Sequence, residues 1–395
     1  TDPVTIDQNV TVLTYTTEPV TFGSLTLGDA AATFAPTLVL STGTLGAGGV
    51  IINPGATLTQ GTTYTIVVGS VTMYSGSVLK HKDNASTRQY VVALQVIDYF
   101  DLQAGSSIAV DGLGYVGGSG PGAGGSAFWG AGGGHGGRGG GDAGEQGGGT
   151  AYDSLINPSD LGSGGGNSGS AGGGAAFLTV GGVFTLNGAV SANGGTTTGA
   201  AAAGGAGGTI KMTIATLAGT GIIRANGGFS TQNGGSGGGG RIALNVTASD
   251  TSNLSVLAAN AGQSGFYLGS AGPIYVQKPD GSSRLIISNP STPRLSGNTP
   301  LTSAIVGAAT LSVSSLTISN ANVTVTSIDS IVVVSSANFG GNSTIANAQG
   351  ILQLPAGETI FPSGMNVTLG TITAGGSLTL NSATLIASSM TVVGN

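Results

Sequence analysis

The residues best suited to chemistry are two histidines and the charged groups near one of them. His135 is followed in the chain by one basic residue and four acids: Arg138, Asp142, Glu145, Asp153 and Asp160. A histidine beside carboxylates can act as a general base or bind a metal ion. His81 lies far away, in the run 80–84 that we expect to be a solvated loop, and an enzyme must gather its titratable groups in one cleft. We therefore predict that the protein is not an enzyme and that the charges near His135 keep glycine loops hydrated.

A second group of acids has the chemistry of a calcium site. Asp98, Asp101 and Asp111 lie near one another in the sequence, and calcium prefers oxygen ligands. We expect them to lie at strand ends and predict no cofactor, with calcium as the alternative. The chain has no cysteine, which excludes disulfides and thiolate metal sites. Polysaccharide-degrading β-helix enzymes use paired carboxylates, and the sparse acids here form no such cluster in the sequence.

Three aromatic residues are candidates for binding a surface. Phe128 and Trp129 stand together within glycine, Trp129 is the sole tryptophan, and Tyr152 follows in the same region. Aromatic rings of this kind can stack on a sugar or on a partner subunit. The alternative for Trp129 is a hydrophobic peg that holds the glycine-rich region on the rest of the protein.

These candidates are carried by a glycine-rich repeat region, residues 111–262, which holds most of the 76 glycines. Strand-like runs begin three successive units, at 173–180, 207–214 and 239–246. The Ala-Asn steps at 192–193, 225–226 and 259–260 set a period of 33 to 34 residues, and a shorter fourth copy spans 271–289. A fixed period of this size is typical of a solenoid or stacked array.

The centre of the region, residues 117–175, repeats Gly-Gly-X steps such as 133–135 and 136–138. A period of three suits polyproline-II-like helices, which have no internal hydrogen bonds and need neighbours to be stable. We predict a packed layer of such polyglycine helices joined to the solenoid, with a set of loose loops as the alternative.

The flanking regions, residues 1–110 and 263–395, contain short apolar-polar alternating runs separated by Gly, Pro and Asn turns, which predict rungs of stacked strands. Charged residues make up only 7% of the chain, and Thr, Ser, Val, Ile and Leu favour strands. We therefore predict an all-β protein, a right-handed parallel β-helix or solenoid with a central glycine-rich insertion. The prediction includes an edge strand at Pro273.

Charge is distributed unevenly along the chain. The net charge is −6, yet all ten Lys and Arg lie between Lys80 and Arg294, so both ends lack basic residues. The absence of a basic patch argues against a nucleic-acid partner, and no apolar run is long enough for a transmembrane helix. Strand edges with little charge are poorly protected against pairing with other chains. We predict that the end strands form the contact between subunits, through Val10, Val12, Thr14, Met390, Val392 and Val393.

Several runs resemble those of secreted glycine-rich β-solenoid surface and matrix proteins of bacteria: 77–81, 100–108, 111–115, 161–166, 238–243 and 272–276. The resemblance covers about residues 70–290. The glycine layer is also similar to the polyglycine helices of phage tail-tip adhesins. The resemblance implies an extracellular protein with a surface, matrix or adhesive role. Because the chain starts at Thr1 and shows no secretion signal, we expect a processed or excerpted chain.

Together these features predict an extracellular structural protein that assembles with copies of itself into a filament, sheath or matrix. An adhesin that binds glycans or another cell through its glycine loops is the first alternative. An ice-binding solenoid is the second, prompted by the Thr-rich run Thr62, Thr63 and Thr65.

Overall fold

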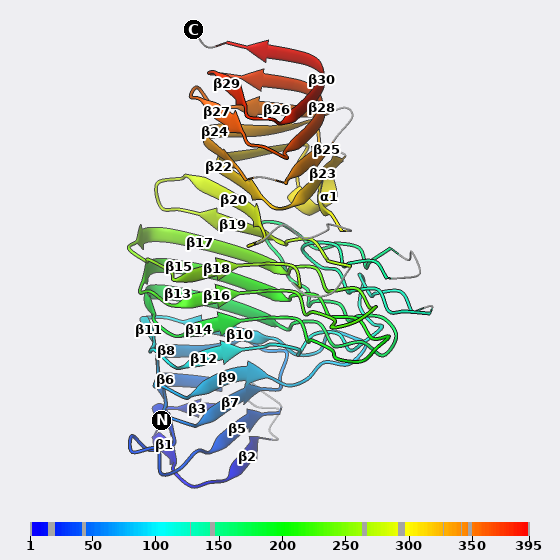
Figure 1. Ribbon diagram of the computed structural model, residues 1–395. Helices are drawn as coiled ribbons and strands as arrows, with labels where there is room; N and C mark the ends of the chain where they lie inside the picture. The colour runs from blue at the N-terminus through cyan, green and yellow to red at the C-terminus, as the bar shows by residue number, and fades with distance from the viewer. Residues whose placement is uncertain are drawn as a thin grey trace.

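A computed structural model describes residues 2–14, 20–41, 45–126, 128–142, 147–262, 267–290, 297–326, 328–340, 342–346 and 350–393. Strands account for 47% and helix for 1%, which confirms the predicted all-β class. The strands stack along an elongated molecule whose two termini lie at opposite ends (Figure 1). The described residues include no helix that is long and apolar enough to cross a membrane.

The first strand stack consists of two sheets of parallel strands that share one apolar core. The first sheet is the N-terminal part of a 20-stranded sheet that continues through β20 into the second stack, and the second sheet has eight strands. The first sheet contains β1 (Pro3–Ile6), β3 (Val20–Phe22), β4 (Ser24–Leu27), β6 (Leu45–Ile52), β8 (Ile66–Met73), β10 (Val92–Val96), β11 (Tyr99–Leu102), β13 (Ala175–Leu186), β15 (Thr209–Ala218), β17 (Arg241–Asp250) and β19 (Pro273–Gln277). The second contains β2 (Thr11–Thr14), β5 (Thr37–Leu40), β7 (Thr57–Gln60), β9 (Val78–His81), β12 (Ser107–Ala109), β14 (Ala189–Ser191), β16 (Ile222–Arg224) and β18 (Val256–Ala258).

The repeat units stack in register, as their period predicted. Ala175 of β13 pairs with Thr209 of β15, which pairs with Arg241 of β17, and all three strands are parallel. Alternate side chains such as Ile210 and Ile242 point into the core and are almost completely buried. Each unit therefore adds one strand to each sheet and extends a continuous core, because a single unit cannot bury its own apolar face.

The fourth copy departs from the predicted pattern. After β19 the chain turns back as β20 (Ser283–Ser288), which pairs antiparallel to β19. β19 is therefore paired on both sides, with β17 and β20, and the predicted edge strand at Pro273 is wrong. Proline is tolerated because it occupies the first position of the strand, where its missing N–H costs least.

The second strand stack begins at β20 and continues toward the C-terminus with parallel strands. It contains β21 (Thr299–Thr302), β22 (Thr310–Ser319), β23 (Asn322–Thr326), β24 (Ser330–Phe339), β25 (Thr344–Ala346), β26 (Ile351–Leu354), β27 (Thr359–Phe361), β28 (Asn366–Ala374), β29 (Leu378–Leu380), β30 (Thr384–Val392) and one short helix, α1 (Ser303–Val306). A separate apolar core fills this stack, with the Phe339 and Phe361 rings stacked 5.1 Å apart.

The glycine segments form a layer beside the first stack, which we call the glycine layer: the described residues of 114–174, 193–208, 226–240 and 259–272 (Figure 1). Their backbones bond to one another across the layer. The Gly132 N–H donates to the Gly140 carbonyl and the Gly140 N–H to the Ser236 carbonyl, each at 2.8 Å. Backbone atoms of neighbouring segments occupy the space that a side chain would need at most of these glycines. The described part of the layer is therefore packed, as predicted, and is not a set of loose loops.

Candidate functional site

His81 is a buried structural histidine. It ends strand β9 and is completely buried, so the predicted solvated loop at 80–84 is wrong at this residue. Its Nδ1 lies 2.7 Å from the Lys82 carbonyl oxygen, and its Nε2 accepts the Ala175 N–H at 3.3 Å. Burial lowers the pKa of His81 to about 4, so the ring is neutral at pH 7. Its two nitrogens hold the chain where the glycine layer meets β13.

His135 lies in a different place, within a buried polar cluster of the glycine layer: His135, Tyr152, Asp153, Ser163 and Arg241. The His135 ring is fully buried, with Nδ1 2.9 Å from the Gly207 carbonyl oxygen and Nε2 3.6 Å from Asp153 Oδ2. The ring of Tyr152 lies 4.8 Å from it. The structure therefore brings together three of the residues that sequence spacing grouped, since Asp153 lies beside His135 and accepts the N–H of Asp160, but it encloses the histidine in protein.

Asp153 and Arg241 carry the opposite charges of this cluster. Burial alone would raise the pKa of Asp153, but His135 and the N–H groups of Asp160 and Ser154 outweigh it and hold this pKa below its usual range. Burial lowers the pKa of Arg241 to about 10. The Arg241 Nε donates to the Tyr152 carbonyl at 2.8 Å, so the side chain joins strand β17 to the glycine layer.

The hydroxyl groups of two tyrosines tie the same region together. Tyr152 donates its hydroxyl to the Leu161 carbonyl, and the hydroxyl oxygen lies 2.8 Å from Ser163 Oγ. The Tyr115 hydroxyl donates to Asp160 at 2.7 Å. Burial raises the pKa of both phenols, which stay protonated and serve as donors. These contacts fix the backbone around the polar cluster.

Arg138, also named near His135, lines a cavity of about 600 Å³ between the glycine layer and the second stack, together with Tyr152 and Asp153 of the polar cluster. Asp142 is buried, and Glu145 lies outside the described residues.

The three acids proposed for calcium do not form a metal site. Asp111 accepts hydrogen bonds from Ser191 and Asn193, whereas Asp101 accepts one from Gln103. Over the part of the chain that the structure describes, no three His, Asp or Glu side chains group in a way that could hold a metal ion.

The three aromatic candidates lie in two different settings. Phe128 is 77% exposed and packs edge-on against Trp129, with ring centres 4.9 Å apart. Tyr152 is half-buried, and its hydroxyl is occupied within the polar cluster. Phe128 and Trp129 therefore present an exposed aromatic surface to solvent, whereas the hydroxyl of Tyr152 points into the protein.

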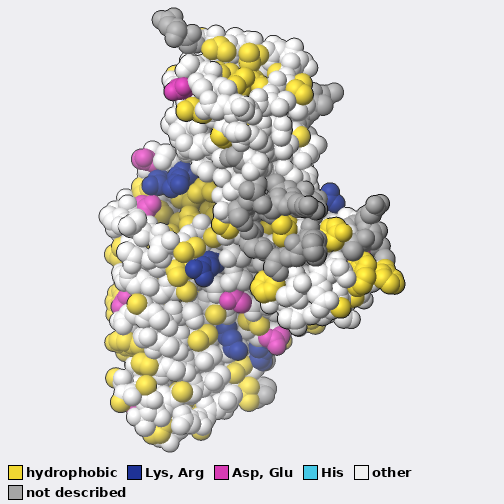
Figure 2. Space-filling model, in the orientation of Figure 1, with side chains coloured by type: hydrophobic (Ala, Val, Ile, Leu, Met, Phe, Trp, Pro, Cys, Tyr) yellow, Lys and Arg dark blue, Asp and Glu magenta, His cyan; other side chains and the backbone are white. Residues whose placement is uncertain are grey.

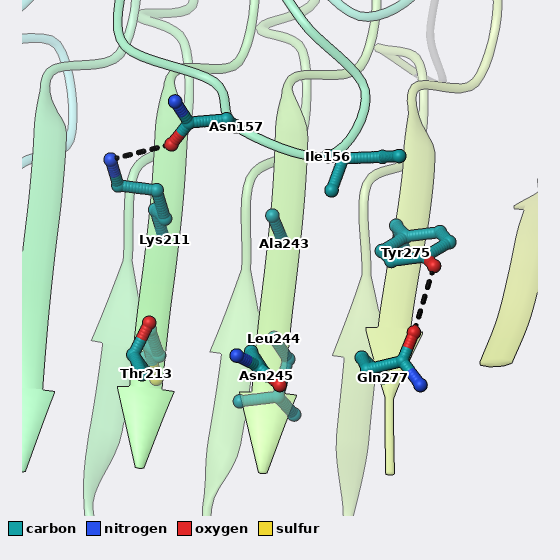
Figure 3. Close-up of a pocket in the computed structure, with 10 residues that line it drawn as sticks. Ile156, Asn157, Lys211, Thr213, Ala243, Leu244, Asn245, Tyr275 and Gln277 are labelled. Carbon is teal, nitrogen blue, oxygen red and sulfur yellow. Dashed lines mark hydrogen bonds between the residues drawn. The ribbon is translucent and has the colours of Figure 1, made fainter. Parts of the chain in front are cut away.

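A hollow on the outer face of the first sheet was not anticipated from sequence. This outer hollow, about 290 Å³ in volume, lies over β15, β17 and β19 beneath the segment 156–157 (Figure 3). It is lined by Ile156, Asn157, Lys211, Met212, Thr213, Ala243, Leu244, Asn245, Tyr275 and Gln277. The repeat contains the information needed to predict the hollow, because Lys211, Ala243 and Tyr275 occupy the same position in three successive units and place a small residue between two large ones.

The predicted contact residues lie on strands at the two ends of the molecule. Val10 is 46% exposed just before β2, and Val12 and Thr14 on β2 are partly buried. Met390, Val392 and Val393 at the other end are 56%, 45% and 68% exposed. The Thr-rich run 62–65, which prompted the ice-binding alternative, forms a bend between β7 and β8 and offers no flat threonine ladder.

Comparison with known proteins returned no match for this chain among protein families, curated proteins or solved structures.

Proposed function

We propose that this protein is an extracellular structural protein whose copies join end to end into a filament, sheath or surface matrix. In this proposal the chain is a right-handed parallel β-helix, and the glycine layer consists of polyglycine-II-like helices. It would then belong with the secreted glycine-rich surface and matrix proteins of bacteria that its sequence resembles.

The observation that carries the proposal is a strand with a free edge at each end of the molecule. Among the described residues, β30 pairs only with β28, β1 only with β4 and β2 only with β5, so each end presents unpaired backbone groups. Exposed apolar side chains accompany them, with Leu13 47% exposed at one end and Ile386 57% exposed at the other. A free apolar edge is a template for pairing with another chain.

Charge supports pairing between copies at these ends. The residues before Lys80 and after Arg294 include no Lys or Arg. On the face in Figure 2, charged side chains lie mostly over the middle of the molecule, and few occur near its ends. Both ends carry only negative charge, with four acids before Lys80 and two after Arg294, and at this low density like-charge repulsion opposes contact between copies only weakly.

The geometry favours an open assembly over a closed dimer. The two free edges lie at opposite ends of the molecule and differ in sequence (Figure 1). A contact between unlike surfaces is heterologous, and repeated without closure it makes a filament. Parallel pairing of β30 with β1 of the next copy would continue the sheet to which both strands belong and cover both ends of the core.

The test compares two variants that each replace an equally exposed isoleucine with lysine. Ile386→Lys places a charge on β30, whereas Ile97→Lys changes a residue that is also 57% exposed but lies away from the ends. Sedimentation velocity over a range of concentrations should show assembly of the unmodified chain and of Ile97→Lys. Ile386→Lys should weaken assembly at least about tenfold, the equivalent of roughly 1.4 kcal/mol. A chain that stays monomeric at high concentration, or equal assembly of the two variants, would refute the proposal.

A second candidate function is adhesion through Phe128 and Trp129. It is favoured by the 77% exposure of Phe128, which is unusual for a large apolar ring packed on a tryptophan. Trp129→Ala should then abolish binding to glycan-coated or cell surfaces but leave assembly unchanged. Loss of both properties, or of neither, would count against an adhesive role for this pair.

A further inference from the structure

We propose that the outer hollow binds a saccharide unit that carries a carboxylate, such as a uronic acid residue of an acidic polysaccharide. The hollow lies on the face of the first sheet, so this inference is independent of assembly through the strand edges.

The shape of the outer hollow follows from one small residue in a row of large ones. Lys211, Ala243 and Tyr275 lie side by side on β15, β17 and β19, and their side chains are on the outer face. Neighbouring strands are about 4.8 Å apart, so the lysine and the tyrosine are about 10 Å apart across the alanine. Ala243 forms the floor, and Ile156 covers the space from above (Figure 3). The volume of about 290 Å³ is near the lower limit of ligand pockets, roughly 300 Å³, and suits one or two sugar rings.

The lining combines an aromatic ring with hydrogen-bonding groups. Tyr275 donates its hydroxyl to Gln277 Oε1 at 2.9 Å, and the Gln277 amide donates to the Gly281 carbonyl at 2.9 Å. The tyrosine is thereby held in one orientation before any ligand arrives. Thr213 and Asn245 form a second row beside Gln277 and offer a hydroxyl and an amide. An apolar ring beside polar groups is suited to a sugar, which has an apolar ring face and hydroxyls at its edge.

Lys211 adds the preference for a negative charge. Its Nζ donates to Asn157 Oδ1 at 3.0 Å and lies 5.0 Å from the centre of the Phe177 ring. The Arg88 guanidinium lies 5.8 Å from the same ring, so a second positive charge stands near the lysine, outside the lining of the hollow. Partial burial lowers the pKa of Lys211, which shows that water solvates the ammonium incompletely. A carboxylate in the hollow would make a charge-assisted hydrogen bond there, which is stronger than a neutral one.

The acid nearest to this lysine is already engaged by other groups. Asp153 attracts Lys211, but its two oxygens accept N–H bonds from Ser154, Ser159 and Asp160. Lys211 is therefore able to pair with an anion from solvent.

The proposal is tested by titration calorimetry of the full chain with two probes, trigalacturonic acid and the neutral trisaccharide galactotriose. We expect the acidic probe to bind and the neutral one to bind at least about tenfold more weakly. Lys211→Met keeps a long side chain against Phe177 and should remove this difference between the probes. Absence of binding of trigalacturonic acid, or equal affinity for the two probes, would overturn the proposal.

A second variant locates the site independently of charge. Ala243→Leu fills the floor of the outer hollow from the outside of the sheet and should reduce binding of trigalacturonic acid at least about tenfold. Ala109→Leu is the matched control, because Ala109 is a partly exposed alanine on β12 of the other sheet. Circular dichroism establishes that both variants are folded. Binding that survives Ala243→Leu in a folded protein, or that Ala109→Leu weakens equally, would place the saccharide elsewhere and contradict the proposal.

Discussion

In the second strand stack, buried side chains such as Ile318 and Phe361 fill the space between strands, whereas in the glycine layer neighbouring backbones touch directly. The stack depends on removal of apolar surface from water, and its strands alternate buried and exposed residues to achieve it. The glycine layer has few side chains to bury, and its order comes from backbone hydrogen bonds between segments distant in sequence. Two different interactions therefore offset the entropy cost of ordering the backbone in this chain: burial of apolar side chains in the stack and backbone hydrogen bonds in the glycine layer.

The difference predicts that a single added methyl group destabilises the glycine layer far more than the second stack. In Gly139→Ala, the new methyl would overlap the carbonyl oxygen of Gly132, and backbone cannot move aside as a side chain can. We expect a loss of about 3 kcal/mol or more in the free energy of unfolding, measured by urea denaturation. Gly357→Ala in the second stack is the control, because nothing lies within 4 Å of the added group. Its effect should stay within about 0.5 kcal/mol, and similar losses in the two variants would contradict direct backbone packing.

The two strand stacks should also differ in their response to acid, because His81 of the first stack lies where that stack meets the glycine layer. The folded protein lowers the pKa of His81 from 6.5 to about 4 through burial, so the unfolded chain binds a proton at a pH where the folded chain does not. The stability from neutral His81 is therefore present above pH 6.5 and is lost as the pH falls toward 4, by about 3 kcal/mol in total.

Amide hydrogen exchange at several pH values measures this response region by region. Protection around β9 and Ala175 should fall between pH 6.5 and 4, because these residues hold the ring. The second stack contains no histidine, so its protection should change less. His81→Gln should remove the pH dependence in that range, and an unchanged dependence would assign it to another group.

A smaller effect is expected where a side chain supports the glycine layer. Tyr152→Phe removes a hydroxyl that bonds to Leu161 and Ser163, and should cost about 1–2 kcal/mol of unfolding free energy. Tyr64→Phe is the matched control, since Tyr64 is 57% exposed, and it should have almost no effect. Equal stability of the two variants would show that the hydroxyl of Tyr152 does not stabilise the layer.

Local patterns in the sequence predicted much of the strand structure. The alternating runs Ser24–Leu27, Thr37–Leu40 and Leu378–Leu380 in the flanking regions are strands, because alternation and turn residues are local signals. The 33–34-residue period also predicted which units lie side by side. The antiparallel return of β20 was missed, since Leu285–Ser288 has the same strand character whichever direction it pairs.

The candidate sites were harder to predict because they depend on contacts between distant residues. The repeat predicts only that Arg241 belongs to a strand, whereas in the structure its guanidinium group donates a hydrogen bond to the Tyr152 carbonyl, far away in the sequence. His81 lay in a dense charge cluster, which favoured a solvated loop, and its burial depends on Ala175 in a later unit. The outer hollow follows from the size of Ala243 relative to its neighbours in register, which hydrophobic periodicity does not report.

The most direct test of backbone packing is amide hydrogen exchange across residues 117–142 and 147–175. Exchange takes place in the intact protein, which is then digested, and the peptides are analysed by mass spectrometry. Amides that bond between glycine segments, such as those of Gly132, Gly140 and Gly149, should exchange as slowly as those in β13 and β15. Exchange of these glycine amides at the rate of an unfolded peptide, with the strands still protected, would contradict a packed glycine layer.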